Sequence, residues 1–359
     1  MKYGFDNLLI NDREIFDTVY SQQQKLPNSK LYEICRNRGI LLSPYEDRES
    51  LATYISNLYY DWNFIKNLLE QINHDEKSNK VTSSVLDTDN LAKIKEVLKE
   101  ISPDYEDKHI SVKNNGKNKV EINMTTSKVE LNKSRMIQRP LKDQMIIIEK
   151  QGDKVILRHN SDEAINPFIE KLIQATSSKL GKIITPQKID LKDIIVPDFR
   201  NKFFLNLIDL DSDNNILIDV KRIKVHHNIH GSTDYDLEGD EEGSIKSALL
   251  SGKSLHTNGM YKNLKKLGHY ITEITWVTKD LSKNIAIEIN AGFENPKTCT
   301  NFFYDIKWYY KFSTRIDGFV ATHSKFKDTE KAKYNAFFDK ISIEIYKDIK
   351  EEYEISLKP

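Results

Sequence analysis

The sequence has few cysteines, prolines and glycines, no net charge and no long apolar run. Cys35 and Cys299 are its only cysteines, which excludes a disulfide framework and predicts two buried thiols in a reducing compartment. Without a run of eighteen apolar residues or a signal-peptide pattern, we expect a cytoplasmic protein with no membrane partner. The chain has 54 basic residues (Lys and Arg) and 54 acidic residues (Asp and Glu), so affinity for nucleic acid would have to come from local patches of positive charge.

The residues that are present have the composition of a folded protein. Hydrophobic residues make up 38% of the 359 residues and aromatic residues 10%, which allows a sizeable core. The patterns predict an α+β protein with an all-helical module at 1–102 and a polar linker at 103–118. A larger mixed α+β domain is expected at 119–359, and a break near 181–200 would subdivide it.

Two short helices joined by a turn are predicted between residues 31 and 58, after a first helix that Asn11 and Glu14 begin with a capping box. Gly39 is placed to end the first of the two in the left-handed conformation. Ser43 is expected to cap the second, with Pro44 at its first position and Glu46 completing a capping box.

This arrangement resembles the helix-extension-helix group, which includes the SAP-type DNA-binding modules. The resemblance implies that the basic residues of the segment contact DNA, and these are Lys30, Arg36, Arg38 and Arg48. Nearby carboxylates balance them, namely Glu33, Glu46, Asp47 and Glu49. The alternative interpretation is that the helical region docks a partner protein or another subunit.

The mixed domain is expected to contain three hairpins and several helices. The hairpins are predicted at 145–158, 203–225 and 270–290. Helices are predicted at 161–180, closed by Gly181, and at 244–251, 257–267, 298–312 and 328–352. In the helix at 298–312, the aromatic run that begins at Trp308 is interpreted as core or oligomer interface rather than as a base-stacking platform.

The sharpest candidate for chemistry combines Asp198 with the Ile-Leu-Ile-Asp-Val-Lys run at 216–221. Side chains two residues apart on a strand share a face, so Asp219 and Lys221 are expected to lie together. The pattern resembles the PD-(D/E)xK nuclease group. The resemblance implies a Mg²⁺ site on Asp219 and a second carboxylate, with the lysine orienting the nucleophile. Asp198 and Asp209 both stay open as that second carboxylate, and the second predicted hairpin would make Asp209 a metal ligand beside Asp219.

Two weaker patterns offer other ligands. Glu288 lies on a predicted strand without a lysine two residues on, and Glu273 is expected across the hairpin. His226, His227 and His230 form a cluster, for which a strand end or a phosphate contact is favoured over zinc.

Basic residues outside the helical module also gather in groups that suit phosphate contacts, including Arg222, Lys224, Lys262, Lys265 and Lys266. The leading hypothesis is therefore a cytoplasmic nucleic-acid-binding protein, with DNA favoured, of a type used in bacterial antiviral defence. The alternatives are a Mg²⁺-dependent nuclease and a non-enzymatic scaffold that oligomerises or recruits a partner enzyme.

Overall fold

The computed structural model describes residues 10–73, 80–108, 110–114, 116, 118–127, 129–133, 135–138, 141–209, 215–227 and 246–358. They form helices and antiparallel strands, which confirms the α+β prediction. The chain divides into two compact units. The first comprises Met1–Lys77, Asn90–Ile148 and Asp162–Ile184, and the second comprises Ser78–Asp89, Glu149–Ser161 and Thr185–Pro359. The predicted linker at 103–118 does not separate the units, because it holds the 3₁₀ helix η2 (Ser102–Lys108) and strand β2 (Ser111–Asn114).

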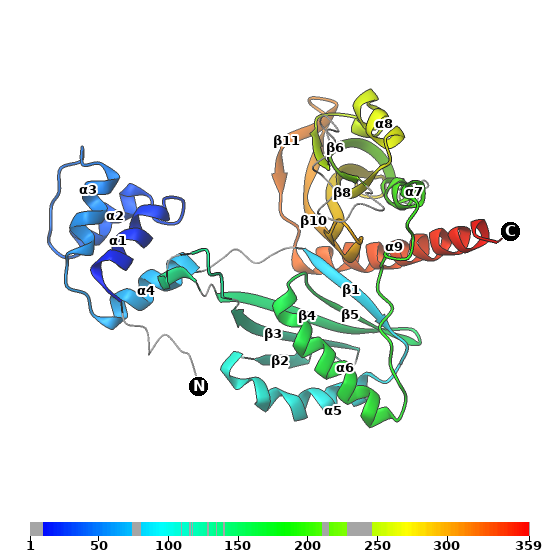
Figure 1. Ribbon diagram of the computed structural model, residues 1–359, viewed down its shortest axis with the longest axis horizontal. Helices are drawn as coiled ribbons and strands as arrows, with labels where there is room; N and C mark the ends of the chain where they lie inside the picture. Colours follow the sequence, from blue (N-terminus) through cyan, green and yellow to red (C-terminus); the bar gives the residue numbers. More distant parts are fainter. Residues whose placement is uncertain are drawn as a thin grey trace, which may run out of the picture. The chain divides into compact units, whose positions relative to one another are not determined.

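The first unit begins with a bundle of short helices (Figure 1). These are α1 (Asp12–Ser21), α2 (Asn28–Arg36), α3 (Arg48–Ser56) and α4 (Trp62–Asn73), which together we call the helical module. The capping box of Asn11 and Glu14 is confirmed, with Glu14 N donating to Asn11 Oδ1 over 2.9 Å and Asn11 N donating to Glu14 Oε2 over 3.0 Å. Apolar side chains on one face of each helix, together with η3 (Arg135–Ile137), form the module's core.

The predicted start of the third helix is wrong by several residues. Helix α3 begins at Arg48, because the Asp47 carboxylate accepts a hydrogen bond from Ser50 N over 2.7 Å and so caps the helix. Ser43 and Glu46 lie before the helix, where their backbone carbonyls accept hydrogen bonds from the Tyr32 hydroxyl over 2.9 and 3.3 Å. Gly39 does adopt the left-handed conformation, with φ of +75°.

The rest of the first unit consists of three adjacent strands and two helices. The strand order is β2, β3 (Lys119–Ser127), β4 (Leu141–Gln151). Helix α5 (Leu91–Ile101) packs against α6 (Asn166–Leu180), which follows the short η4 (Glu163–Ile165) (Figure 1). The prediction that Gly181 ends α6 is confirmed by its φ of +64°.

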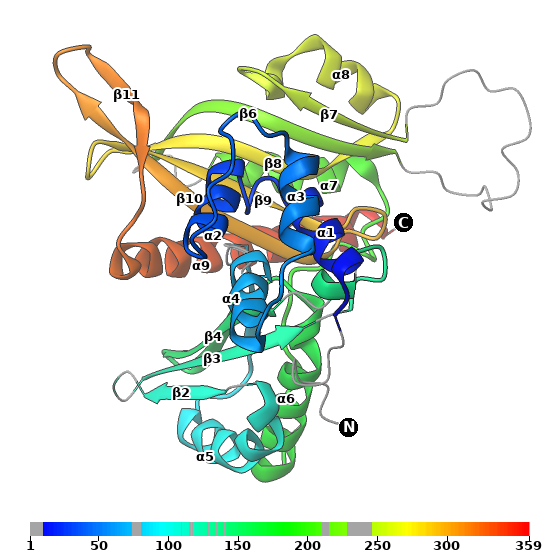
Figure 2. The ribbon, with the colours of Figure 1, turned by 90° about the vertical axis from the view of Figure 1, so that its left-hand side faces the viewer.

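The second unit is a long antiparallel sheet with helices on one face. Its strands follow the order β5 (Lys154–Asn160), β1 (Val81–Leu86), β10 (Thr300–Ser313), β9 (Ile285–Asn295), β8 (His269–Asp280), β6 (Asn215–His227), β7 (Ser247–Ser251), and β11 (Gly318–Ser324) pairs with β10. The helices are α7 (Pro197–Ile208), η5 (Leu255–Thr257), α8 (Gly259–Lys266) and α9 (Asp328–Ser356). The main core lies where α7 and α9 cover the central strands (Figures 1 and 2).

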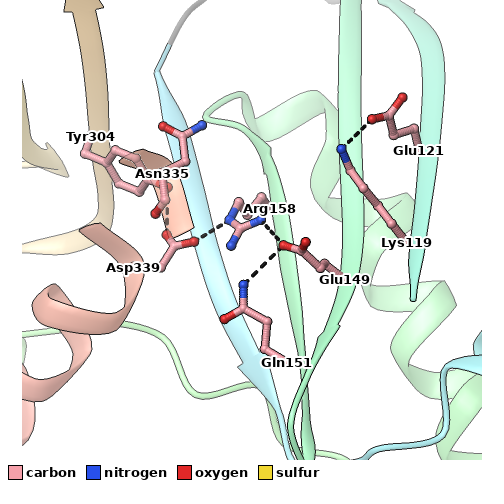
Figure 3. Close-up of polar contacts among 8 residues, drawn as sticks. All are labelled: Lys119, Glu121, Glu149, Gln151, Arg158, Tyr304, Asn335 and Asp339. Atoms are coloured by element: carbon pink, nitrogen blue, oxygen red, sulfur yellow. Dashed lines mark hydrogen bonds and ion pairs between the residues drawn. The ribbon is translucent and has the colours of Figure 1, made fainter. Parts of the chain in front are cut away.

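A buried charged network joins α9 to the sheet (Figure 3). The Arg158 guanidinium on β5 donates to both Asp339 of α9 and Glu149, the second over 2.8 Å. The Tyr304 hydroxyl on β10 donates to the other oxygen of Asp339 over 2.7 Å. Because Arg158 and Asp339 are both almost fully buried, each charge depends on the other, and together they fix the position of α9.

Four predicted elements of the chain have the wrong type. Residues 81–86 form strand β1 rather than part of an all-helical module, and 244–251 contributes strand β7 in its described part. Residues 203–208 belong to helix α7, because Pro197 starts a helix that buries Phe203, Phe204 and Leu207. Residues 300–313 form strand β10, which contributes the alternate residues Phe302, Tyr304 and Ile306 to the main core, while Phe303 and Asp305 between them are buried as well.

Candidate nucleic-acid interface

One end of the second unit's sheet is built from β6, β7 and α8 (Figure 2). Ile223 and Val225 of β6 are buried, so the intervening Lys224 faces the solvent, and Arg222 is also exposed. Strand β7 pairs with β6 as the last strand in the sheet order. The Asn258 side chain caps α8 by accepting a hydrogen bond from Met260 N over 2.8 Å.

The exposed surface of these elements is strongly basic. Residues 215–227 and 246–269 contain one carboxylate, Asp219, and eight cations: Lys221, Arg222, Lys224, Lys246, Lys253, Lys262, Lys265 and Lys266. All of these cations except Lys221 are exposed, and we call those seven the basic edge. The Asp219 carboxylate is occupied, because Ser254 N donates to it over 2.6 Å.

The geometry of α8 explains why its lysines stay at the surface. Tyr261 and Leu264 are buried, so Lys262, Lys265 and Lys266 fall on the outward side of the helix. One of the three has a carboxylate nearby: Lys265 Nζ lies 3.3 Å from the exposed Asp198 in the first turn of α7. An exposed pair of this kind holds a lysine weakly and leaves it available to phosphate.

Most of the basic residues predicted to contact DNA in the helical module bind other groups of the same module. The Arg48 guanidinium donates to Tyr20 O over 2.8 Å, to Leu26 O over 2.9 Å and to Asn28 Oδ1 over 2.9 Å, and it also donates to Val19 O. Burial lowers the pKa of Arg48 from its usual value. This arginine therefore ties α1, α2 and α3 together.

Two further cations of the module have partners inside it. Arg38 donates to Tyr59 O, and its guanidinium lies 4.4 Å from the centre of the Tyr60 ring. Lys30 forms an ion pair with Glu33 over 2.9 Å. Arg36 is exposed on the last turn of α2. Of the four residues predicted to contact DNA through the SAP-like segment, Arg38 and Arg48 are thus used in folding contacts, and Lys30 is held only by an exposed ion pair.

Asp219 and Lys221 of the nuclease-like motif face different partners. In the register between β6 and β8, Val220 and Arg222 oppose the consecutive residues Trp276 and Thr275, so Lys221 is the extra residue of a bulge. Its ammonium lies 2.7 Å from Glu288 Oε2 on β9 and 3.0 Å from the Tyr310 hydroxyl on β10.

The structure therefore pairs Lys221 with Glu288, the residue that the sequence offered as a weaker candidate. The Glu288 carboxylate is buried, accepts a hydrogen bond from the Tyr310 hydroxyl over 2.9 Å, and lies 3.6 Å from Lys307. Burial alone would raise the pKa of Glu288, but the hydrogen bonds from Lys221 and Tyr310 outweigh it and lower this pKa below its usual value. The same contacts raise the pKa of Lys221 against the opposing effect of burial.

The remaining predicted metal ligands are not gathered into a site. Asp198 is in the first turn of α7 and Asp209 caps its C-terminal end, so the hairpin expected to bring Asp209 beside Asp219 does not form. In the part of the chain that the structure describes, no three His, Cys, Asp or Glu side chains are placed to hold a metal ion. His227 Nε2 lies 2.9 Å from Leu267 O, and His230 falls outside the described residues.

Neither comparison with known proteins assigns a function: no protein-family model and no curated protein matches the chain. Among the residues that the structure describes, no helix is both long and apolar enough to cross a membrane.

Proposed function

We propose that this protein binds nucleic acid through the basic edge. The observation that supports the proposal is that the described residues 215–227 and 246–269 carry eight cations and one carboxylate. Residues 228–245, which lie outside the described part of the chain, carry six further carboxylates in the sequence. Phosphate groups attract such a surface, and each neutralised phosphate releases condensed counterions, which favours binding. DNA is the first ligand to test.

The arrangement suits backbone contact rather than base readout. Lysines supply most of the basic edge, and a lysine ammonium is a flexible point charge without the planar fork that arginine uses for bidentate contacts. We therefore expect low sequence preference and a strong dependence on salt. Cleavage of the bound strand is the second candidate function, and its support is the resemblance of Asp219 and Lys221 to the nuclease motif, since the contact with Glu288 occupies Lys221.

The test is a fluorescence-anisotropy titration of labelled DNA over a range of salt concentrations. The variant replaces Lys262, Lys265 and Lys266 of α8 with glutamate. Its matched control carries the same three changes at Lys340, Lys347 and Lys350, which are exposed on α9, so both variants have the same net charge.

We expect the α8 variant to bind about 100-fold more weakly at low salt and to lose about three units of the slope of log K against log salt, because each lost phosphate contact removes about 0.9. The α9 control should bind within about twofold of the unmodified protein, because its lysines lie outside the proposed contact surface. Equal losses in the two variants would show that net charge, and not the basic edge, determines binding. A parallel gel with Mn²⁺ detects any cleaved product.

A further inference from the structure

A second surface of the same unit carries partly exposed aromatic rings beside cations. Trp308, Tyr310 and Phe312 occupy alternate positions of β10, and the paired strand β11 places His323 opposite Tyr310 and Phe319 opposite Phe312. We call these five side chains the aromatic face. His323 is exposed and the other four are half-buried.

The rings of the aromatic face are distinct from the hydrophobic core. The intervening residue Tyr309 packs on Phe326, with ring centres 4.8 Å apart, and Phe326 packs on Tyr334 of α9 and against the core. Because successive side chains of a strand point to opposite sides, Trp308 and Tyr310 lie on the side away from α9. The interpretation of the C-terminal aromatic residues as core holds for the buried Phe338 and for Phe326, Tyr334 and Tyr346, which pack against the core. Tyr309 contacts this core through Phe326, and Trp308 and Tyr310 do not belong to it.

The orientation of these rings is fixed by polar contacts. Trp308 Nε1 donates to the Tyr310 hydroxyl over 3.0 Å, and that hydroxyl donates to the buried Glu288. The Trp308 ring stacks on His323 with centres 4.2 Å apart and planes 26° apart. A ring held in one orientation loses little conformational entropy when a ligand stacks on it.

Cations border the rings on several sides. Lys221 Nζ lies 4.8 Å from the centre of the Tyr310 ring and Lys307 Nζ lies 5.7 Å from the Trp308 ring. Lys279 Nζ lies 5.5 Å from the Phe312 ring. Lys311 and Arg315 of the hairpin are also exposed, as are Lys325 and Lys327, which follow β11. Cross-strand stacking alone would stabilise a hairpin, but it gives no reason for so many cations around the rings.

We infer that the aromatic face binds single-stranded nucleic acid, with bases stacked on Trp308 and its neighbours and phosphates on the surrounding lysines. Alternate positions of a strand are about 7 Å apart, a step that an extended single strand can match with successive bases. A duplex hides its base faces in its own stack, so it cannot use these rings. The inference rests on the proposed function and names the form of nucleic acid that this unit prefers.

The experiment compares a labelled single-stranded oligothymidine with a duplex of the same length, using Trp308→Ala, Trp308→Phe and the control Trp62→Ala on the helical module. We expect Trp308→Ala to weaken single-strand binding about tenfold and duplex binding by less than about twofold, because a duplex offers no exposed base face for Trp308 to stack on. Trp308→Phe should restore most of the single-strand affinity, because it keeps a ring at this position. In a Trp62→Phe background, the oligothymidine should quench tryptophan fluorescence.

The outcomes separate the inference from the proposed function. If Trp308→Ala leaves single-strand affinity unchanged, or weakens single-strand and duplex binding equally, the inference is wrong while duplex binding through the basic edge stands. If the unmodified protein binds neither oligonucleotide, both proposals fail. A denaturation midpoint for each variant confirms that a loss of binding is not a loss of folding.

Discussion

The helical module and the basic edge contain similar numbers of cations but use them differently. Residues 12–73 carry seven Lys or Arg residues and nine Asp or Glu residues, whereas residues 215–227 and 246–269 carry eight and one. In the module, Arg38 and Arg48 bind backbone carbonyls of neighbouring segments. On the basic edge, seven cations remain at the surface. A group of basic residues therefore indicates a binding surface only where few carboxylates and few backbone carbonyls lie close enough to bind those residues.

Among the substitutions that test this difference between the two regions, Arg48→Met is expected to have the largest effect, and the effect is on stability. This change removes the donor for three carbonyls and the Asn28 side chain, and hydrogen bonds to a charged group contribute about 1.5–3 kcal/mol each. Since the acceptors can partly turn to water, we expect a net loss of about 2–3 kcal/mol of unfolding free energy. Affinity for DNA should not change under conditions where the variant is folded.

Urea denaturation followed by circular dichroism measures this loss. Arg48→Lys is the matched control, and it should recover only part of the stability because an ammonium cannot span acceptors from three segments. If Arg48→Met folded with unchanged stability but bound DNA more weakly, Arg48 would belong to a binding surface and the contrast between the two regions would be lost.

Particular residues show how far sequence patterns predict this structure. Asn11, Glu14 and Gly181 were correctly assigned because caps and left-handed glycines depend on neighbours a few residues away. The start of α3 was missed because Ser43 and Asp47 are both competent caps, and tertiary contacts of Tyr32 decide between them.

The candidate site was predictable only in part, because some of its contacts are local in the sequence and others depend on the tertiary structure. Exposed lysines on α8 follow from the helical period of residues 257–267, which the sequence indicates correctly. The contact between Lys221 and Glu288 depends on a bulge in β6 and on a strand order that no local pattern encodes. The prediction of a helix at 298–312 is wrong for Trp308, Tyr310 and Phe312, because three consecutive aromatic residues at 308–310 do not distinguish the helical period from the strand period.

Lys221 combines features of both regions. It lies on β6 beside the residues of the basic edge, but like the arginines of the helical module it binds a group of the protein itself, the buried Glu288 carboxylate. Glu288→Gln should lower the unfolding free energy at pH 7 by about 1–2 kcal/mol, because a neutral amide accepts more weakly from Lys221 and Lys307. The pKa of Glu288 is lower in the folded state than in the unfolded state. Its stabilisation is therefore complete above the unfolded value of about 4.3 and disappears as the pH falls through the folded value.

Urea midpoints of the two proteins between pH 7 and pH 3 measure this difference. It should stay constant down to about pH 5 and shrink below about pH 4.3. Affinity for DNA at pH 7 should stay the same or rise slightly, because the substitution leaves Lys221 with less negative charge beside it. A stability difference that persists undiminished to pH 3 would show that shape, and not charge, makes Glu288 important.

The smallest effect is expected from Arg36→Glu, and this substitution tests the resemblance to SAP-type modules most directly. Arg36 is the one predicted DNA contact of the module that is exposed on a helix without a folding contact among the described interactions. If the module bound DNA, reversing this charge would weaken binding about tenfold, as a lost phosphate contact does at low salt. We expect a change of less than about twofold, because four carboxylates surround the segment and repel phosphate. A tenfold loss would show that DNA binds to the helical module, and that the module's cations are available to phosphate as those of the basic edge are.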